Sequence, residues 1–153
     1  MQHLIKKNKW ECLLYSFAMA FGYGPEVLID EIGHDGSEFI NVSLGDPHGR
    51  RGFHIQEFIR IAVDAGKNVT PLQIAPVSQV GSQLVEITPN VKQFVSVIAD
   101  YRGVLTGVTP RGNYHAVAFE YGLIYDPDGP KYYFALDDCM TRGFIPREAW
   151  IVK

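Results

Sequence analysis

Three residues of types that together perform nucleophilic catalysis occur far apart in the chain: Cys12, His115 and Asp126. Cys12 stands near the start of an apolar stretch with helical spacing. The partial positive charge of a helix N-terminus favours the thiolate over the thiol, so this position suits a nucleophile. A histidine can serve such a thiolate as general acid and base, and a carboxylate can orient that imidazole and stabilise its charged form. The sequence therefore predicts a Cys-His-Asp catalytic group.

The element that must position Cys12 is a predicted helix over residues 9–21. Asn8 is its expected N-cap, with Glu11 three residues later to complete a capping box, and the segment from Gly22 to Pro25 ends it. The residues outside the main apolar stripe are uncharged as well, which is typical of a buried central helix. The stripe itself consists of Trp10, Leu13, Leu14, Phe17 and Phe21.

Two predicted strands, residues 114–121 and 123–126, position the other two residues. A turn near Gly122 would pair them as an antiparallel hairpin, which places His115 and Asp126 at the same end of the sheet. Asp128 is a nearby competitor for the orienting role. The Asp-Pro-Asp-Gly run that contains both aspartates is also a turn signature that needs no catalytic reason.

The remaining pattern places helices first and strands later, which predicts an α+β fold. Its N-terminal central helix would pack on an antiparallel sheet from the C-terminal third, in a single domain over residues 1–153. The other expected helices are residues 26–32, 54–65 and 91–101; the other expected strands are residues 68–75, 104–109, 131–136 and 149–152; residues 33–52 are expected to be a long surface loop.

Composition limits the class of protein. The chain has 153 residues, of which 46% are hydrophobic and 20% charged, as expected for one folded domain. Its net charge of −3 argues against a dedicated nucleic-acid binder. No apolar stretch reaches the roughly 18–20 residues that span a bilayer.

Two cysteines, Cys12 and Cys139, are too few for a disulfide framework and indicate a reducing, cytoplasmic location. Ala18-Met19-Ala20 has the form of a signal-peptide cleavage site, but Glu11 and the helical order favour a packed helix.

The order of these residues resembles the papain-like cysteine peptidases, and most closely the compact bacteriocin-leader peptidase domains of export transporters. Two motifs carry the resemblance: residues 10–18 (WECLLYSFA) and residues 113–126 (NYHAVAFEYGLIYD). It implies a papain-like fold, with Cys12 as nucleophile, His115 as base and Asp126 as the orienting carboxylate. It also implies hydrolysis of an amide or isopeptide bond in a peptide or protein substrate, through an acyl-enzyme, without a metal or organic cofactor.

One departure from the family concerns the oxyanion. The family usually has a glutamine five or six residues before its cysteine, and this chain has Lys7 and Lys6 there. Asn8 or Lys6 are the candidate substitutes, beside the backbone N–H of Cys12. Losing one oxyanion donor typically costs on the order of 100–1000-fold in rate. Two alternatives therefore stay open: an inactive pseudo-peptidase that binds a peptide or protein partner, and a peptidoglycan amidase-peptidase.

Other polar groups are expected to have structural or surface roles rather than catalytic or metal-binding ones. The Asp-Pro-Asp-Gly run lacks the distal bidentate Glu of a calcium loop. His34, His48 and His54 match no familiar zinc spacing, and Cys139 would be a remote fourth ligand. Arg50 and Arg51 are expected to be a solvated loop pair, and Trp150 a core residue. The sequence does not indicate the oligomeric state.

Overall fold

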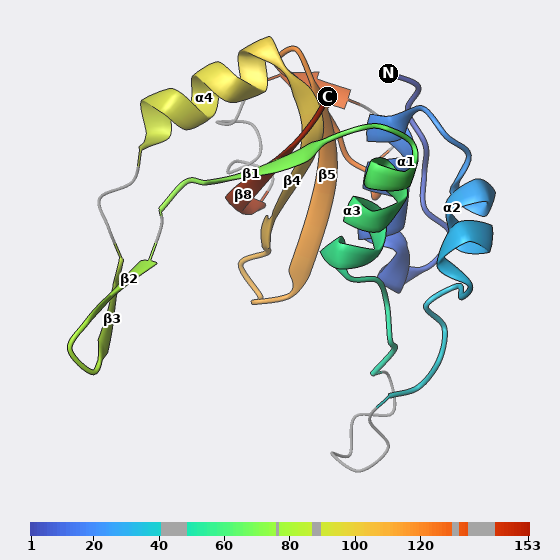
Figure 1. Cartoon of the computed structure of the whole chain (residues 1–153), viewed down its shortest axis with the longest axis horizontal. Coiled ribbons are helices and arrows are strands. Elements are labelled where there is room, and N and C mark those ends of the chain that lie inside the picture. Colours follow the sequence, from blue (N-terminus) through green and yellow to red (C-terminus); the bar gives the residue numbers. More distant parts are fainter. Residues whose placement is uncertain (41–48, 76, 87–89, 130–131, 135–142) are drawn as a thin grey trace.

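A six-stranded antiparallel sheet with helices on both faces organises the α+β fold (Figure 1). The computed structural model describes residues 1–40, 49–75, 77–86, 90–129, 132–134 and 143–153. The helical elements are η1 (Lys9–Glu11), α1 (Cys12–Phe21), α2 (Pro25–Ile32), α3 (Ile55–Asp64) and α4 (Val91–Asp100). The strands are β1 (Val69–Gln73), β2 (Val77–Val80), β3 (Gln83–Glu86), β4 (Arg102–Val108), β5 (Tyr114–Glu120), β6 (Leu123–Tyr125), β7 (Tyr132–Phe134) and β8 (Ile145–Val152).

The helix that carries Cys12 is buried along its whole length, as its composition predicts. All ten residues of α1 are buried, and Gly22 ends the helix in a left-handed conformation with φ of 77°. The start differs from the prediction, because residues 9–11 form the 3-10 turn η1 and the α-helix begins at Cys12. Asn8 and Glu11 form the expected capping box at that turn. The first residue of the α-helix is therefore the candidate nucleophile.

Two apolar clusters lie on opposite faces of the sheet, because alternate residues of a strand point to opposite sides. Val104 of β4 packs with α1, α2 and α3, whereas Leu105 packs with α4. Within the first cluster the rings of Phe17 and Phe58 stack with centroids 4.5 Å apart. The helices α1 and α3 are thus held against one face, and α4 covers the other (Figure 1).

The strands of the six-stranded sheet lie in the order β1-β8-β4-β5-β6-β7. The predicted strand over residues 149–152 is longer than expected, since β8 begins at Ile145. Likewise β4 begins at Arg102, two residues before the expected start at residue 104, and ends at Val108. Gly103 and Gly107 let the two backbones approach closely: an added Cβ would lie 2.0 Å from the carbonyl oxygen of Trp150 and 2.1 Å from that of Ile145, respectively.

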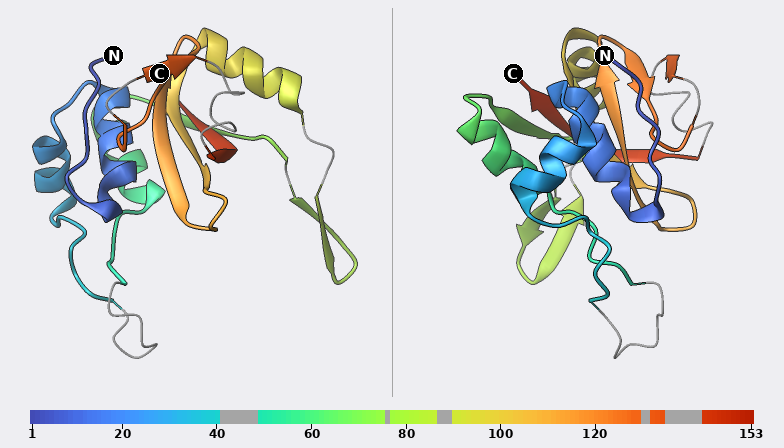
Figure 2. Two further views of the ribbon diagram at one scale, coloured as in Figure 1. Left: turned by 180° about the vertical axis from the view of Figure 1, so that it is seen from behind. Right: turned by 90° about the vertical axis from the view of Figure 1, so that its right-hand side faces the viewer.

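The hairpin β2–β3 is a feature that the sequence analysis did not anticipate. It forms a separate two-stranded sheet with Gly81 at its turn, and it projects from the six-stranded sheet (Figures 1 and 2). Each strand has only four residues, so the alternation of polar and apolar side chains is too short to predict it.

The length and composition of the described helices decide whether any of them could cross a membrane. No single one of them is both long and apolar enough to cross a bilayer; the segments Lys9–Phe21 and Pro25–Ile32 would reach that length only together, and they are bent by 112°.

Candidate active site

Three elements bring the predicted catalytic residues together. Cys12 is the first residue of α1, which packs on β5; His115 is the second residue of β5; and Asp126 directly follows β6. The pairing between β5 and β6 reaches only to Ala118 opposite Tyr125, short of the end of β5 that carries His115. Beyond the paired residues, the chain that continues past β6 carries Asp126 alongside the His115 ring.

The closest contact in this group joins His115 to Asp126. The Nε2 atom of His115 lies 3.1 Å from Oδ1 of Asp126, and the exposed fractions of the two side chains are 8% and 18%. Because a carboxylate only accepts hydrogen bonds, Nε2 carries the proton in this contact. The backbone N–H of Asp128 also donates to Oδ1 of Asp126, at 2.8 Å, and the ring of Phe144 packs edge-on against His115. The imidazole is therefore held in one orientation, with Nδ1 as its second functional atom.

Electrostatics favour the charged form of this pair. Burial alone lowers the pKa of His115, but hydrogen bonds to Asp126 and to the buried Cys12 outweigh it and raise the pKa to about 9. Burial likewise raises the pKa of Asp126, but the hydrogen bond and charge of His115 outweigh it and hold the pKa below its ordinary value. The pair can thus exist as an imidazolium hydrogen-bonded to a carboxylate.

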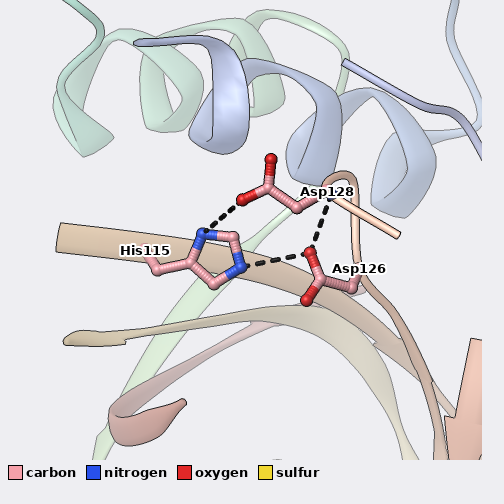
Figure 3. A group of neighbouring side chains, drawn as sticks. All are labelled: His115, Asp126 and Asp128. Atoms are coloured by element: carbon pink, nitrogen blue, oxygen red, sulfur yellow. Dashed lines mark hydrogen bonds and ion pairs between the residues drawn. The ribbon is translucent and has the colours of Figure 1, made fainter. Parts of the chain in front are cut away.

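Asp128 contacts the same ring from another side. Its Oδ2 atom lies 3.7 Å from Nδ1 of His115, and its side chain is half-exposed. Figure 3 shows the two carboxylates at different nitrogen atoms of the ring. The shorter contact and the deeper burial both belong to Asp126, so Asp126 is the better orienting group and Asp128 lies at the face that the nucleophile would use.

The N-terminal segment holds the loop that carries both aspartates. The backbone N–H of Lys6 donates to the carbonyl of Pro127 at 3.0 Å, and Nε2 of His3 donates to the carbonyl of Asp126 at 2.8 Å. The Lys6 ammonium lies 2.7 Å from Oδ1 of Asp128. The sequence analysis did not assign His3 or Lys6 to this positioning role, because no local pattern connects them with residues 126–128.

The two oxyanion candidates both have partners. Lys6 contacts Asp128, as described, and its ammonium also donates to the carbonyl of Lys9 at 3.4 Å. The side-chain amide of Asn8 donates to Glu11 at 3.0 Å, within the capping box. Lys6 is therefore the candidate that lies beside the catalytic group, whereas Asn8 serves the start of the helix.

A cavity of about 440 Å³ lies among α1, α3, β5 and β8. Leu13 and Tyr114, the chain neighbours of Cys12 and His115, contribute to its wall. Tyr114 is half-exposed, and partial burial raises the pKa of its phenol to about 12 despite a hydrogen bond to Thr106. The lining is largely apolar and comprises Leu13, Phe53, His54, Ile55, Gln56, Ile59, Tyr114 and Trp150.

Other residues considered in the sequence have separate places. His34 pairs with Glu57 at 2.8 Å, and His54 is the N-cap of α3. Arg50, expected to be solvated, instead packs its guanidinium against the ring of Phe39 at 3.5 Å, which brings the two described sides of the 33–52 segment together. His48 and Cys139 lie outside the described residues.

Comparison with known proteins gives no family assignment. A scan against protein-family models and a search of curated proteins each find no match to this chain. The candidate site is accordingly defined by the contacts among Cys12, His115 and Asp126.

Proposed function

We propose that this chain is a cysteine peptidase-like thiol hydrolase with a papain-like fold, cleaving an amide or isopeptide bond of a peptide or protein. The observation that carries the proposal is the contact of 3.1 Å between Nε2 of His115 and Oδ1 of Asp126, on the strand β5 against which α1 packs with Cys12 as its first residue. This arrangement supplies a nucleophile, a proton carrier and an orienting carboxylate in one cluster.

In the first half of the reaction, the Cys12 sulfur attacks the substrate carbonyl carbon and forms an S–C bond. His115 gives its Nδ1 proton to the leaving nitrogen as the C–N bond breaks, which releases an amine and leaves a thioester. In the second half, neutral His115 takes a proton from water, and the hydroxide attacks the thioester carbon. The S–C bond breaks, the carboxylic acid departs, and the thiolate–imidazolium pair is restored. Asp126 stabilises the charged ring throughout.

Two neighbouring features support this assignment. The cavity beside Leu13 and Tyr114 provides an apolar wall against which a substrate chain can lie. The oxyanion of the tetrahedral intermediate is assigned to the backbone N–H of Cys12 and to the Lys6 ammonium, which replaces the amide of the family's glutamine. An ammonium can donate three hydrogen bonds, so its contacts with Asp128 and with the carbonyl of Lys9 leave one donor for the oxyanion.

The test is the pH dependence of Cys12 alkylation by iodoacetamide, read by mass spectrometry. A Cys139→Ser background leaves a single thiol, and His115→Ala in that background is the matched variant. We expect rapid labelling that persists below about pH 6–7 and that the His115→Ala change abolishes. If the alkylation rate instead rises with a midpoint near pH 8.5, as for an ordinary thiol, and does so equally in both proteins, the assignment is wrong.

The second candidate is a pseudo-peptidase that binds a peptide without cleaving it. The engagement of Lys6 with Asp128 and of Asn8 with Glu11 favours this alternative, because each candidate oxyanion donor already has a partner. A peptide library incubated with the protein separates the two: new amine termini that disappear in Cys12→Ala support hydrolysis, and saturable binding without new termini supports the pseudo-peptidase.

A further inference from the structure

A second cavity, of about 460 Å³, lies beside α1, between the N-terminal segment and the turn that leads into α2. Within the described part of the chain, its lining includes no member of the candidate catalytic group of Cys12, His115 and Asp126. Its volume falls within the range of small-molecule sites, about 300–1,000 Å³. The apolar and aromatic part of its wall comprises Leu4, Ile5, Ala18, Met19, Tyr23 and Pro25.

Backbone hydrogen bonds hold the walls of this α1–α2 cavity. The N–H of Leu4 donates to Sδ of Met19 at 3.2 Å, and the N–H of Lys7 donates to Oε2 of Glu11 at 3.0 Å. On the other wall, Gly22 ends α1 in a left-handed conformation and donates its N–H to the last turn of the helix. A ligand therefore meets a preformed space, and little chain entropy is lost when it binds.

Three polar side chains of the lining have no hydrogen-bond or ion-pair partner among the described residues: Lys7, Tyr15 and Glu26. Tyr15 is only 5% exposed, so the cavity is the space through which its hydroxyl can reach a partner. Burial, followed by the charges of Glu11 and Glu26, raises the pKa of this phenol, so the hydroxyl stays protonated and can donate. One cation, one anion and one hydroxyl donor thus line the same partly apolar space.

These groups restrict the chemistry of the ligand. A purely apolar ligand would remove water from Lys7, Tyr15 and Glu26 without replacing its hydrogen bonds. A ligand with a doubly charged phosphate would meet a single cation and the repulsive carboxylate of Glu26. An amine without an acidic group would leave Lys7 without a counterpart. A molecule with one ammonium, one carboxylate and an apolar side chain complements every part of the lining.

We propose that the α1–α2 cavity binds a small zwitterion with an apolar side chain, of the amino acid or dipeptide class. The Lys7 ammonium binds its carboxylate, the Glu26 carboxylate binds its ammonium, and the Tyr15 hydroxyl donates to its carboxylate. The apolar part of the wall receives the side chain. This binding does not depend on the proposed hydrolase activity, because the two sites share no residue.

The experiment titrates leucine and leucyl-leucine, separately, into the full chain labelled with ¹⁵N. Amide chemical shifts locate the bound ligand and give its dissociation constant, and comparing the two probes distinguishes an amino acid from a dipeptide. For each probe, the N-acetyl analogue removes the ammonium and the carboxamide analogue removes the carboxylate.

The variants address the three polar groups one at a time, and circular dichroism establishes that each is folded. They are Lys7→Gln, Glu26→Gln and Tyr15→Phe; the matched controls are Lys92→Gln on the exposed face of α4 and Glu31→Gln near the end of α2.

We expect saturable shifts at residues 4–7 and 22–26, and each cap should weaken binding by about fivefold or more. Glu26→Gln should remove the preference for the free amine, and Lys7→Gln the preference for the free carboxylate, because each variant removes one partner of one pair. Tyr15→Phe should weaken binding by about twofold or more, and the controls should bind as the unmodified chain does.

Three results would overturn the inference. The first is the absence of saturable shifts with both probes. The second is equal affinity for the free and the capped forms. The third is a set of shifts centred on His115 and Asp126, which would place the zwitterion in the candidate active site instead.

Discussion

The carboxylate of Asp126 holds one edge of the imidazole of His115, with Nε2 and Oδ1 3.1 Å apart. This contact assigns the Nε2 proton and leaves Nδ1 for chemistry. Asp128 lies at Nδ1 instead, at 3.7 Å and with a half-exposed side chain. Two aspartates separated by one proline therefore have different roles at the same ring.

The first prediction separates these two aspartates. Asp126→Asn removes the charge that is hydrogen-bonded to Nε2, so we expect the pKa of His115 to fall from about 9 by roughly 1–3 pH units. Asp128→Asn should have a much smaller effect, because solvent screens its charge. Histidine titration by NMR with a chelator present measures both, and a larger fall in Asp128→Asn would reverse the assigned roles.

The second prediction concerns stability against pH. The pKa of His115 is raised in the folded protein from an ordinary 6.5 to about 9. The contribution of His115 to the free energy of unfolding is therefore complete below pH 6.5 and is lost as the pH rises through 9. We expect the free energy of unfolding to fall by up to about 3 kcal/mol over that window. Urea unfolding at pH 6 and pH 10 measures the change, and His115→Gln should remove most of it; a His115→Gln protein with the same pH dependence would contradict the linkage.

The third prediction concerns the packing that holds α1 in place. Phe17 is fully buried and stacks on Phe58, so Phe17→Ala should destabilise the fold by about 3–5 kcal/mol. Val63→Ala is the control, because that side chain on α3 is 63% exposed and should change stability by less than about 0.5 kcal/mol. Chemical denaturation measures both variants, and similar losses would mean that α1 is not held by this stack.

The fourth prediction concerns the close approach of β4 and β8. An added Cβ at Gly107 would lie 2.1 Å from the carbonyl oxygen of Ile145, so Gly107→Ala must separate the two strands. Gly112→Ala is the matched control: its φ of 78° is strained for alanine, but its Cβ would meet nothing. We expect a loss of about 1–2 kcal/mol for Gly112→Ala and a clearly larger one for Gly107→Ala. Equal losses by thermal unfolding would show that strand separation costs little.

Local patterns in the sequence predicted the elements that carry the candidate site. The apolar run after Asn8 and Glu11 predicted a buried helix, and the hairpin around Gly122 predicted that His115 and Asp126 share one end of the sheet. Both predictions depend on residues that are close together in the chain, where helical or alternating spacing is readable.

The contacts that the sequence did not reveal join distant residues. Lys6 binds Asp128 across more than a hundred residues, and Arg50 packs on Phe39 through a segment that reads only as a polar loop. The sequence analysis named Asp128 as a competitor for the role of orienting His115. Its position at the other ring nitrogen depends on the path that the chain takes after β6. Such pairings follow from packing, which no local pattern encodes.

The position of β8 between β1 and β4 has a consequence for how the chain folds. Among the described residues, β8 joins β1 to the β4–β7 group, so the six-stranded sheet is not continuous until residues 145–152 have been synthesised. During translation, the edges of β1 and β4 that will bind β8 stay unpaired, so the nascent chain depends on late closure by a sequence-distant strand. Such long-range closure slows folding and exposes unpaired strand edges to other chains. We therefore expect substitutions within β8 to reduce soluble yield more than comparably destabilising substitutions in α1.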